Sequence, residues 1–195
     1  MLNAVAMCTP GKPAMARRFC SSLFLLLMSG FCHAAGNPAA RPEFNNKDFS
    51  LRLTPRSPNQ VAAFYEARGF PRAALATIRR TCFIGVSLRN NSDSIVWFDL
   101  GNWHFTTPKG PLPRILRSDW TQHWQQLGLA QRFQSTFRWT LAPEHLDYRP
   151  HEREGGNITL PRTDQPITIT GDIYVGKQKT RLYTIKFENI YCAGN

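Results

Sequence analysis

Histidine and carboxylate side chains are concentrated in one polar segment, residues 142–156. Four of them are candidate ligands for zinc or copper: His145, Asp147, His151 and Glu152. Imidazole and carboxylate groups suit these metals, and loops on a rigid sheet commonly carry such sites. The two histidines are separated by Pro150, however, and their spacing fixes no shared face. A solvated loop whose acids pair with nearby arginines is the favoured alternative, so no cofactor is the first expectation and zinc or copper the second.

The same segment supplies candidates for contact with a partner. Arg149, Arg153 and Asn157 lie in it or next to it, and exposed tryptophan rings can stack on sugars. Trp103 is the tryptophan that we expect at the surface if any is exposed. Core packing is the favoured role for the tryptophans in general, and Trp139 in particular is expected to be buried.

Hydrolase and nucleotide-binding motifs are missing from the sequence. It contains no G-x-S-x-G elbow, no H-E-x-x-H, no P-loop and no G-x-G-x-x-G. Their absence lowers the expectation of catalysis without excluding it. The sequence favours a protein that is not an enzyme.

Residues 1–34 have the pattern of a cleaved secretory signal. Lys12, Arg17 and Arg18 precede an apolar run over 19–31, and small residues follow around Ala34. As a helix the run would reach roughly 20 Å, short of the ~30 Å hydrocarbon core, which argues against a retained anchor. Met15 begins a tidier version of the signal and is a candidate start. We expect a soluble periplasmic or secreted protein, without a lipid anchor because Phe31 precedes Cys32.

Cysteine usage agrees with export. Cleavage after Ala34 leaves two of the five cysteines, Cys82 and Cys192. In an oxidising compartment two cysteines allow one pairing, and both lie in alternating apolar runs rather than in a C-x-x-C motif. The sequence predicts a structural disulfide between them.

Positive charge is the remaining hint about partners. After residue 34 there are 21 basic and 13 acidic side chains, a net charge of +8, and 16 of the basic residues are arginine. Distributed positive charge favours anionic neighbours, so we expect an envelope protein or an anionic glycan or lipid surface as partner. An exported chain rarely meets nucleic acid, which is not expected. The oligomeric state is left open.

Turn signals and alternating apolar residues dominate the chain after residue 48. Residues 35–48 are polar and proline-containing, and we expect little order there. Residues 49–195 are expected to form a single domain with about seven strands and helical inserts near 58–79 and 118–128. Alternation over 133–141 predicts a strand. The fold class is mainly β, an immunoglobulin-like two-sheet β-sandwich with one or two short helical insertions.

Three functions are compatible with these observations. The preferred one is a small exported, non-catalytic binding or assembly module of the bacterial cell envelope. The first alternative is a metal-binding protein or metal-dependent enzyme that uses the 144–154 segment. The second is a chaperone-like sandwich whose sheet edge accepts a strand from a partner.

Overall fold

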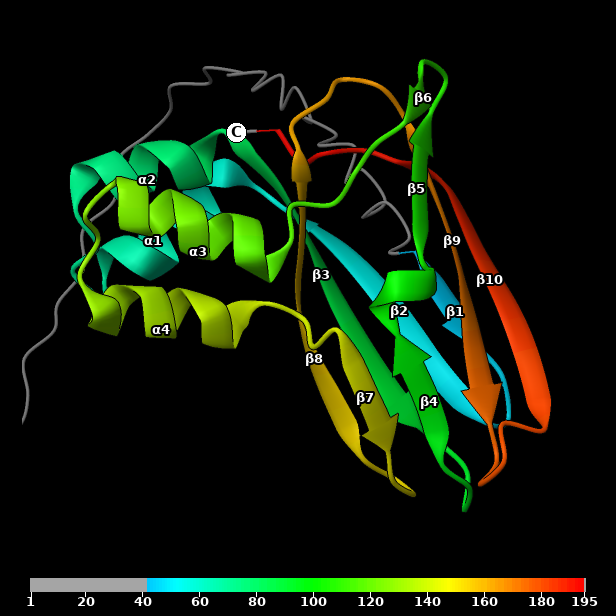
Figure 1. Ribbon diagram of the computed structural model, residues 1–195. Coiled ribbons are helices and arrows are strands. Elements are labelled where there is room, and N and C mark those ends of the chain that lie inside the picture. The colour runs from blue at the N-terminus through cyan, green and yellow to red at the C-terminus, as the bar shows by residue number, and fades with distance from the viewer. Residues whose placement is uncertain (1–41, 195) are drawn as a thin grey trace, which may run out of the picture. The chain divides into compact units, whose positions relative to one another are not determined.

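Two antiparallel sheets form the main layers of the computed structural model, which describes residues 42–194 (Figure 1). The first sheet has the order β1-β2-β3-β8. Its strands are β1 (Glu43–Asn45), β2 (Phe49–Arg56), β3 (Thr81–Asn90) and β8 (Arg153–Pro161). The chain is mainly β, with two antiparallel sheets and four helices.

The second sheet is arranged around β9 (Ile167–Val175). Strand β10 (Arg181–Ile190) pairs with one edge of β9, and β4 and β5 share the other. Strands β7 and β6 continue the sheet outward from β4 and β5. The bounds of the remaining elements are β4 (Val96–Asp99), η1 (Leu100–Asn102), β5 (His104–Thr107), β6 (Gly110–Pro111) and β7 (His145–Tyr148).

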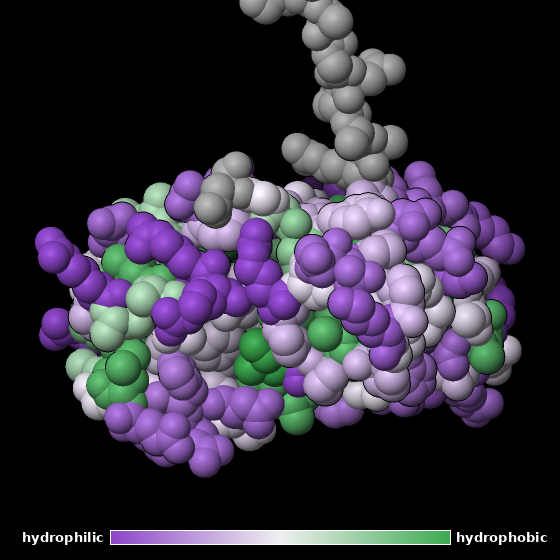
Figure 2. Space-filling view, turned by 90° about the horizontal axis from the view of Figure 1, so that it is seen from above, coloured by the Kyte–Doolittle hydropathy of each residue, from purple (hydrophilic) through white to green (hydrophobic). Residues whose placement is uncertain are grey.

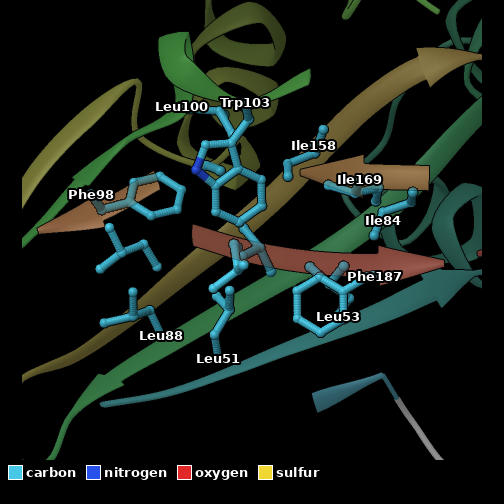
Figure 3. Packing of buried hydrophobic residues seen from close by; sticks show 14 of the residues in the cluster. Leu51, Leu53, Ile84, Leu88, Phe98, Leu100, Trp103, Ile158, Ile169 and Phe187 are labelled. Atoms are coloured by element: carbon cyan, nitrogen blue, oxygen red, sulfur yellow. The ribbon is translucent and has the colours of Figure 1, made fainter. Parts of the chain in front are cut away.

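Trp103 fills the space between the two sheets, so the prediction that it is the exposed tryptophan is wrong. It is 4% exposed, and Figure 3 shows its indole among apolar side chains from both sheets. A Cβ on Gly171 would lie 2.6 Å from the Trp103 ring. The absence of a side chain at Gly171 of β9 therefore leaves the space that the Trp103 ring occupies.

The disulfide between Cys82 and Cys192 is confirmed. The two Cα atoms lie 5.4 Å apart and the residues are 110 positions apart in sequence. Cys82 is in β3 of the first sheet, and Cys192 follows β10 of the second. The bond therefore joins the two layers covalently.

Four helices pack around a second apolar cluster beside β3 and β8 (Figure 1). They are α1 (Pro58–Glu66), α2 (Arg72–Arg79), α3 (Arg117–Gln126) and α4 (Gln131–Thr140). The side chain of Phe83, on the outer face of β3, packs in this cluster. The Trp120 indole N–H donates to the Thr159 hydroxyl of β8 over 2.9 Å, which fixes the helices to the sheet.

Helix α4 corrects the prediction of a strand over 133–141. Phe133, Phe137 and Leu141 are four residues apart, so they share one helical face, which joins the second apolar cluster. Alternation and helical spacing coincide at these three positions. The centroid of the Phe137 ring lies 4.6 Å from that of Trp120 and 5.1 Å from that of Trp124. These contacts stabilise the helical conformation of the segment. Trp139 belongs to the opposite face and is 87% exposed, so its predicted burial is also wrong.

Two segments expected to be irregular contain strands in the parts that the structure describes. Residues 43–45 form β1 because Phe44 stacks on Phe49 and Glu43 pairs with Arg52. The polar segment 142–156 contains β7 and the start of β8 rather than one long loop. The proposed export signal lies outside the described residues. Within 42–194, every helix is too short or too polar to traverse a bilayer.

Buried tyrosines predict a loss of stability in alkali. Burial raises the pKa of Tyr65 to about 12, although a hydrogen bond with Thr140 opposes the shift, and burial also raises the pKa of Tyr148. The folded state holds these protons more tightly than the unfolded state. The stabilisation is therefore complete below the ordinary pKa of about 10 and is lost as the pH rises from there towards the folded value.

We expect the free energy of unfolding to fall by up to about 1.4 kcal/mol per pH unit for each tyrosine in this range. Urea titrations at about pH 9 and about pH 11 measure it. Tyr65→Phe should show a smaller alkaline loss than the parent. Equal stability at both pH values in the parent protein would contradict this reading.

Candidate anion-binding site

Arginine and serine side chains cover the outer face of the first sheet at the end away from the helices. We call this surface the arginine face. It consists of Arg52, Arg89 and Arg153 with Ser50, Ser87 and Glu43. These six residues line a shallow hollow of about 140 Å³. They come from all four strands of the sheet.

Strand register brings the three arginines together. Ser50 of β2 is opposite Arg89 of β3, which is opposite Arg153 of β8. In the next row Arg52 is opposite Ser87. Side chains directly opposite each other lie on the same face of a sheet, so both rows point away from the core.

The Arg89–Arg153 pair has the closer of the two antiparallel geometries. Asn90 donates its backbone N–H to the Glu152 carbonyl over 2.9 Å, one position along the ladder. Hydrogen-bonded and non-hydrogen-bonded pairs alternate, so Arg89 and Arg153 form a non-hydrogen-bonded pair. In such pairs the Cα atoms are about 4.5 Å apart and the side chains lie closest.

Carboxylates balance only part of this charge. Arg52 pairs with Glu43 over 2.9 Å, and Arg153 donates from Nε to the Ser87 hydroxyl over 3.2 Å. No carboxylate side chain lies within ion-pair distance of Arg89 or Arg153 in residues 42–194, and residues 1–41 contain no acidic residue. Like charges directly opposite each other destabilise a sheet, and a bound anion would relieve this repulsion.

Gly155 allows β8 to approach β3 closely beside the arginine face. It is opposite Ser87 on the same outer face. A Cβ at Gly155 would collide with the backbone carbonyl oxygen of Val86, so the strands can approach here only because the side chain is missing.

A groove of about 670 Å³ runs beside the same end of β8. Arg138 and Trp139 from the end of α4 form one wall, with Pro143 and Leu146 from the following segment. Glu152, Glu154 and Gly155 form the other, so the groove itself carries both basic and acidic side chains. Trp139 is the most exposed large apolar side chain of the described residues. The groove and the arginine face adjoin along residues 153–155.

Apolar surface is otherwise scattered. Figure 2 shows small apolar areas separated by hydrophilic side chains on the face seen from above. A broad apolar patch of the kind that marks a large protein interface is not visible on that face. At the arginine face the lining side chains are all charged or hydroxyl-bearing, so charge and hydrogen bonding are the means of recognition available there.

The predicted metal ligands are not brought together. His145 lies 3.0 Å from Asp99, while His151 lies 3.3 Å from Asp93 beyond the other end of β7. A side-chain oxygen of Glu152 instead accepts the N–H of Arg149 over 2.8 Å. Asp147 is opposite Trp97 in the second sheet. Among residues 42–194, no group of three potential ligands gathers where it could hold a metal ion.

The predicted partner-binding residues separate into three environments. Only Arg153 lies in the arginine face. The Arg149 carbonyl accepts a hydrogen bond from the side chain of Asn90 over 2.9 Å, and the side chain of Asn157 donates to the Thr140 carbonyl over 3.0 Å. The backbone of Arg149 and the side chain of Asn157 therefore join segments of the fold, the Arg149 side chain is exposed outside the arginine face, and Trp103 belongs to the core.

Sequence reasoning missed Arg52, Arg89 and Trp139 as candidates. The alternation over 49–53 and 82–89 indicates that Arg52 and Arg89 both point away from the core. It carries no information about which strands are neighbours, so their convergence with Arg153 was not predictable from it. A helical reading of 133–141 would have placed Trp139 opposite the buried Phe137 face.

Comparison with known proteins gives little guidance. The chain matches no protein-family model, and no curated protein matches it. One solved structure with some similarity is that of a candidate lipoprotein (ycdA) from Bacillus subtilis, at 8% identity and a TM-score of 0.38. The match covers 77% of this chain and 39% of that protein, so the chain spans less than half of its length.

Proposed function

We propose that this protein is an exported, non-catalytic binding module of the bacterial cell envelope, and that its arginine face holds an anionic partner. In this proposal the protein acts in the periplasm or outside the cell, and its fold is an immunoglobulin-like sandwich. The signal-like start of the sequence and the disulfide between the two remaining cysteines support export.

The uncompensated pair Arg89–Arg153 carries the proposal. These residues are opposite each other in a non-hydrogen-bonded pair, with Arg52 in the adjoining row and, within residues 42–194, without a carboxylate for either member of the pair. Guanidinium groups bind phosphate, sulfate and carboxylate through paired hydrogen bonds. Three such groups around a hollow with two serine hydroxyls form a site for an anion.

Replacing the three arginines by glutamine should remove binding of polyanions. Isothermal titration with dextran sulfate and with poly-L-glutamate measures it. We expect the triple variant Arg52→Gln, Arg89→Gln, Arg153→Gln to bind at least tenfold more weakly, since a hydrogen bond to a charged group contributes about 1.5–3 kcal/mol. The matched control Arg72→Gln, Arg80→Gln, Arg132→Gln removes the same charge from exposed positions of the helical side. Equal losses of polyanion affinity in both triple variants would mean that net charge alone explains the effect, and would overturn the proposal.

A stability measurement on the single variant Arg89→Gln gives an independent check. Without a ligand, we expect the free energy of unfolding to stay the same or rise by about 0.2–1 kcal/mol, because the like-charge pair is removed. Polyanion binding should weaken at the same time. A variant that keeps or gains stability while it loses affinity for polyanions identifies Arg89 as a binding residue rather than a structural one. Destabilisation without loss of polyanion binding would contradict the assignment.

A further inference from the structure

The outer edge of β8 is used by other segments of the chain at two places. Ala142 donates its N–H to the Asn157 carbonyl over 3.0 Å, and Ile115 donates to the Thr159 carbonyl over 2.9 Å. These carbonyls point away from β3. Residues 157 and 159 belong to the non-hydrogen-bonded pairs of the β3–β8 ladder, the same class as 153 and 155.

The next two outward-facing positions on this edge are Arg153 and Gly155. By the alternation of the ladder, their backbone N–H and C=O groups point away from β3. No other segment within 42–194 hydrogen-bonds to them. A strand edge with free donors and acceptors is a template for pairing with another chain.

These free backbone groups lie next to the groove that contains Trp139. Glu154 and Gly155 form one wall of the groove, and the end of α4 forms another. A tryptophan ring that is 87% exposed offers a large apolar surface to a ligand lying along the edge. The volume of about 670 Å³ is within the usual range for ligand sites.

The geometry points to an extended acidic peptide segment of a partner protein that adds as a strand to β8 at Arg153–Gly155. Every second side chain of such a strand lies on the outer face, beside Arg153 and Arg89, where aspartate or glutamate matches the unbalanced charge. The other side chains of the strand reach the Trp139 groove, where Glu152 and Glu154 would repel an acid and an apolar group fits against Trp139 and Leu146. This inference rests on the proposed function for the charge of the partner and adds its chemical class and its mode of binding.

A peptide is favoured over a glycan by the backbone groups. A glycan can match the arginines and stack on the tryptophan, but it lacks the regular series of N–H and C=O groups that an unpaired strand edge binds. The short parallel bridge between Leu141 and Asn157 shows that this edge already accepts an extended segment one position further along.

The experiment uses an eight-residue peptide of alternating aspartate and valine, with two further versions N-methylated at one or the other set of alternate backbone nitrogens. Isothermal titration with the whole protein compares the three. We expect the parent peptide to bind and at least one methylated version to bind at least tenfold more weakly. Hydrogen exchange at the Gly155 amide should slow when the parent peptide is bound.

Two substitutions at one position separate charge from backbone pairing. Arg153→Gln removes the charge alone, and Arg153→Pro removes the charge and the outward N–H at the first residue of the strand, where proline is tolerated. We expect the proline variant to bind at least fivefold more weakly than the glutamine variant. The methylated peptides keep the test valid if the proline variant fails to fold.

The outcomes separate the two proposals. If all three peptides bind equally and binding still needs the three arginines, strand addition is overturned and the anion-binding function stands. If dextran sulfate binds and no peptide does, the partner is a glycan and the inference is wrong. If neither polyanions nor peptides bind, both proposals fail.

Discussion

Removing the disulfide with Cys82→Ala and Cys192→Ala should lower the free energy of unfolding by about 2–5 kcal/mol. The bond closes a loop of 110 residues, and in the chain-entropy view long loops restrict the unfolded chain most. It also joins β3 of the first sheet to the segment that follows β10 of the second. Urea unfolding of the double variant beside the parent protein measures the loss.

Reductant provides the control for this prediction. The parent protein with a reducing agent should approach the stability of the double variant, whereas the double variant itself should not respond. Cys82 is 1% exposed, so a part of the loss in the variant comes from its smaller side chain rather than from the missing bond. Equal stability of the parent with and without reductant would show that the bond does not stabilise the fold.

The pairing of Cys82 with Cys192 was predictable because the expected mature chain offers no other choice. The first helix was predictable for a similarly local reason. Ser57 and Gln60 form a complete capping box with Pro58 at the first helical position, and every part of that motif lies within four residues. Strands with a regular alternation, such as β3 and β9, belong to the same group. In these cases the deciding information is contained in the segment itself.

Helix α4 was not predictable in this way because its segment fits two periods. Phe133, Phe137 and Leu141 satisfy both an alternating strand and one face of a helix. The choice depends on Tyr65 and Phe83, which pack against Phe137 from α1 and β3. These partners are distant in sequence, so tertiary packing decides the secondary structure here.

The candidate sites show the same division between local and distant information. The histidines and acids of 144–154 are close in sequence, and β7 separates them by its length, with His145 at its start and His151 beyond its end. The arginines are distant in sequence, and strand register makes them neighbours. Closeness in sequence was therefore a poor guide to a site in this fold. The residues that become neighbours are those at matching register positions on adjacent strands, and these are distant in sequence.

Trp103→Ala should destabilise the protein by about 3–5 kcal/mol, whereas Trp139→Ala should be nearly neutral. The chemical change is the same in both variants, so each is the control of the other. Trp103 is 4% exposed and packs between the sheets above Gly171, while Trp139 is 87% exposed. Thermal and urea unfolding measure the difference.

The exposed position of Trp139 also leads to a prediction for binding. Trp139→Ala should weaken binding of the acidic peptide while leaving the fold intact, because the ring forms a wall of the groove beside β8. Its removal should also decrease the quenching of tryptophan fluorescence by added iodide, since an exposed ring is lost. A large loss of stability in Trp139→Ala would mean that 133–141 is a strand after all, and the groove would have to be abandoned with the helix that forms it.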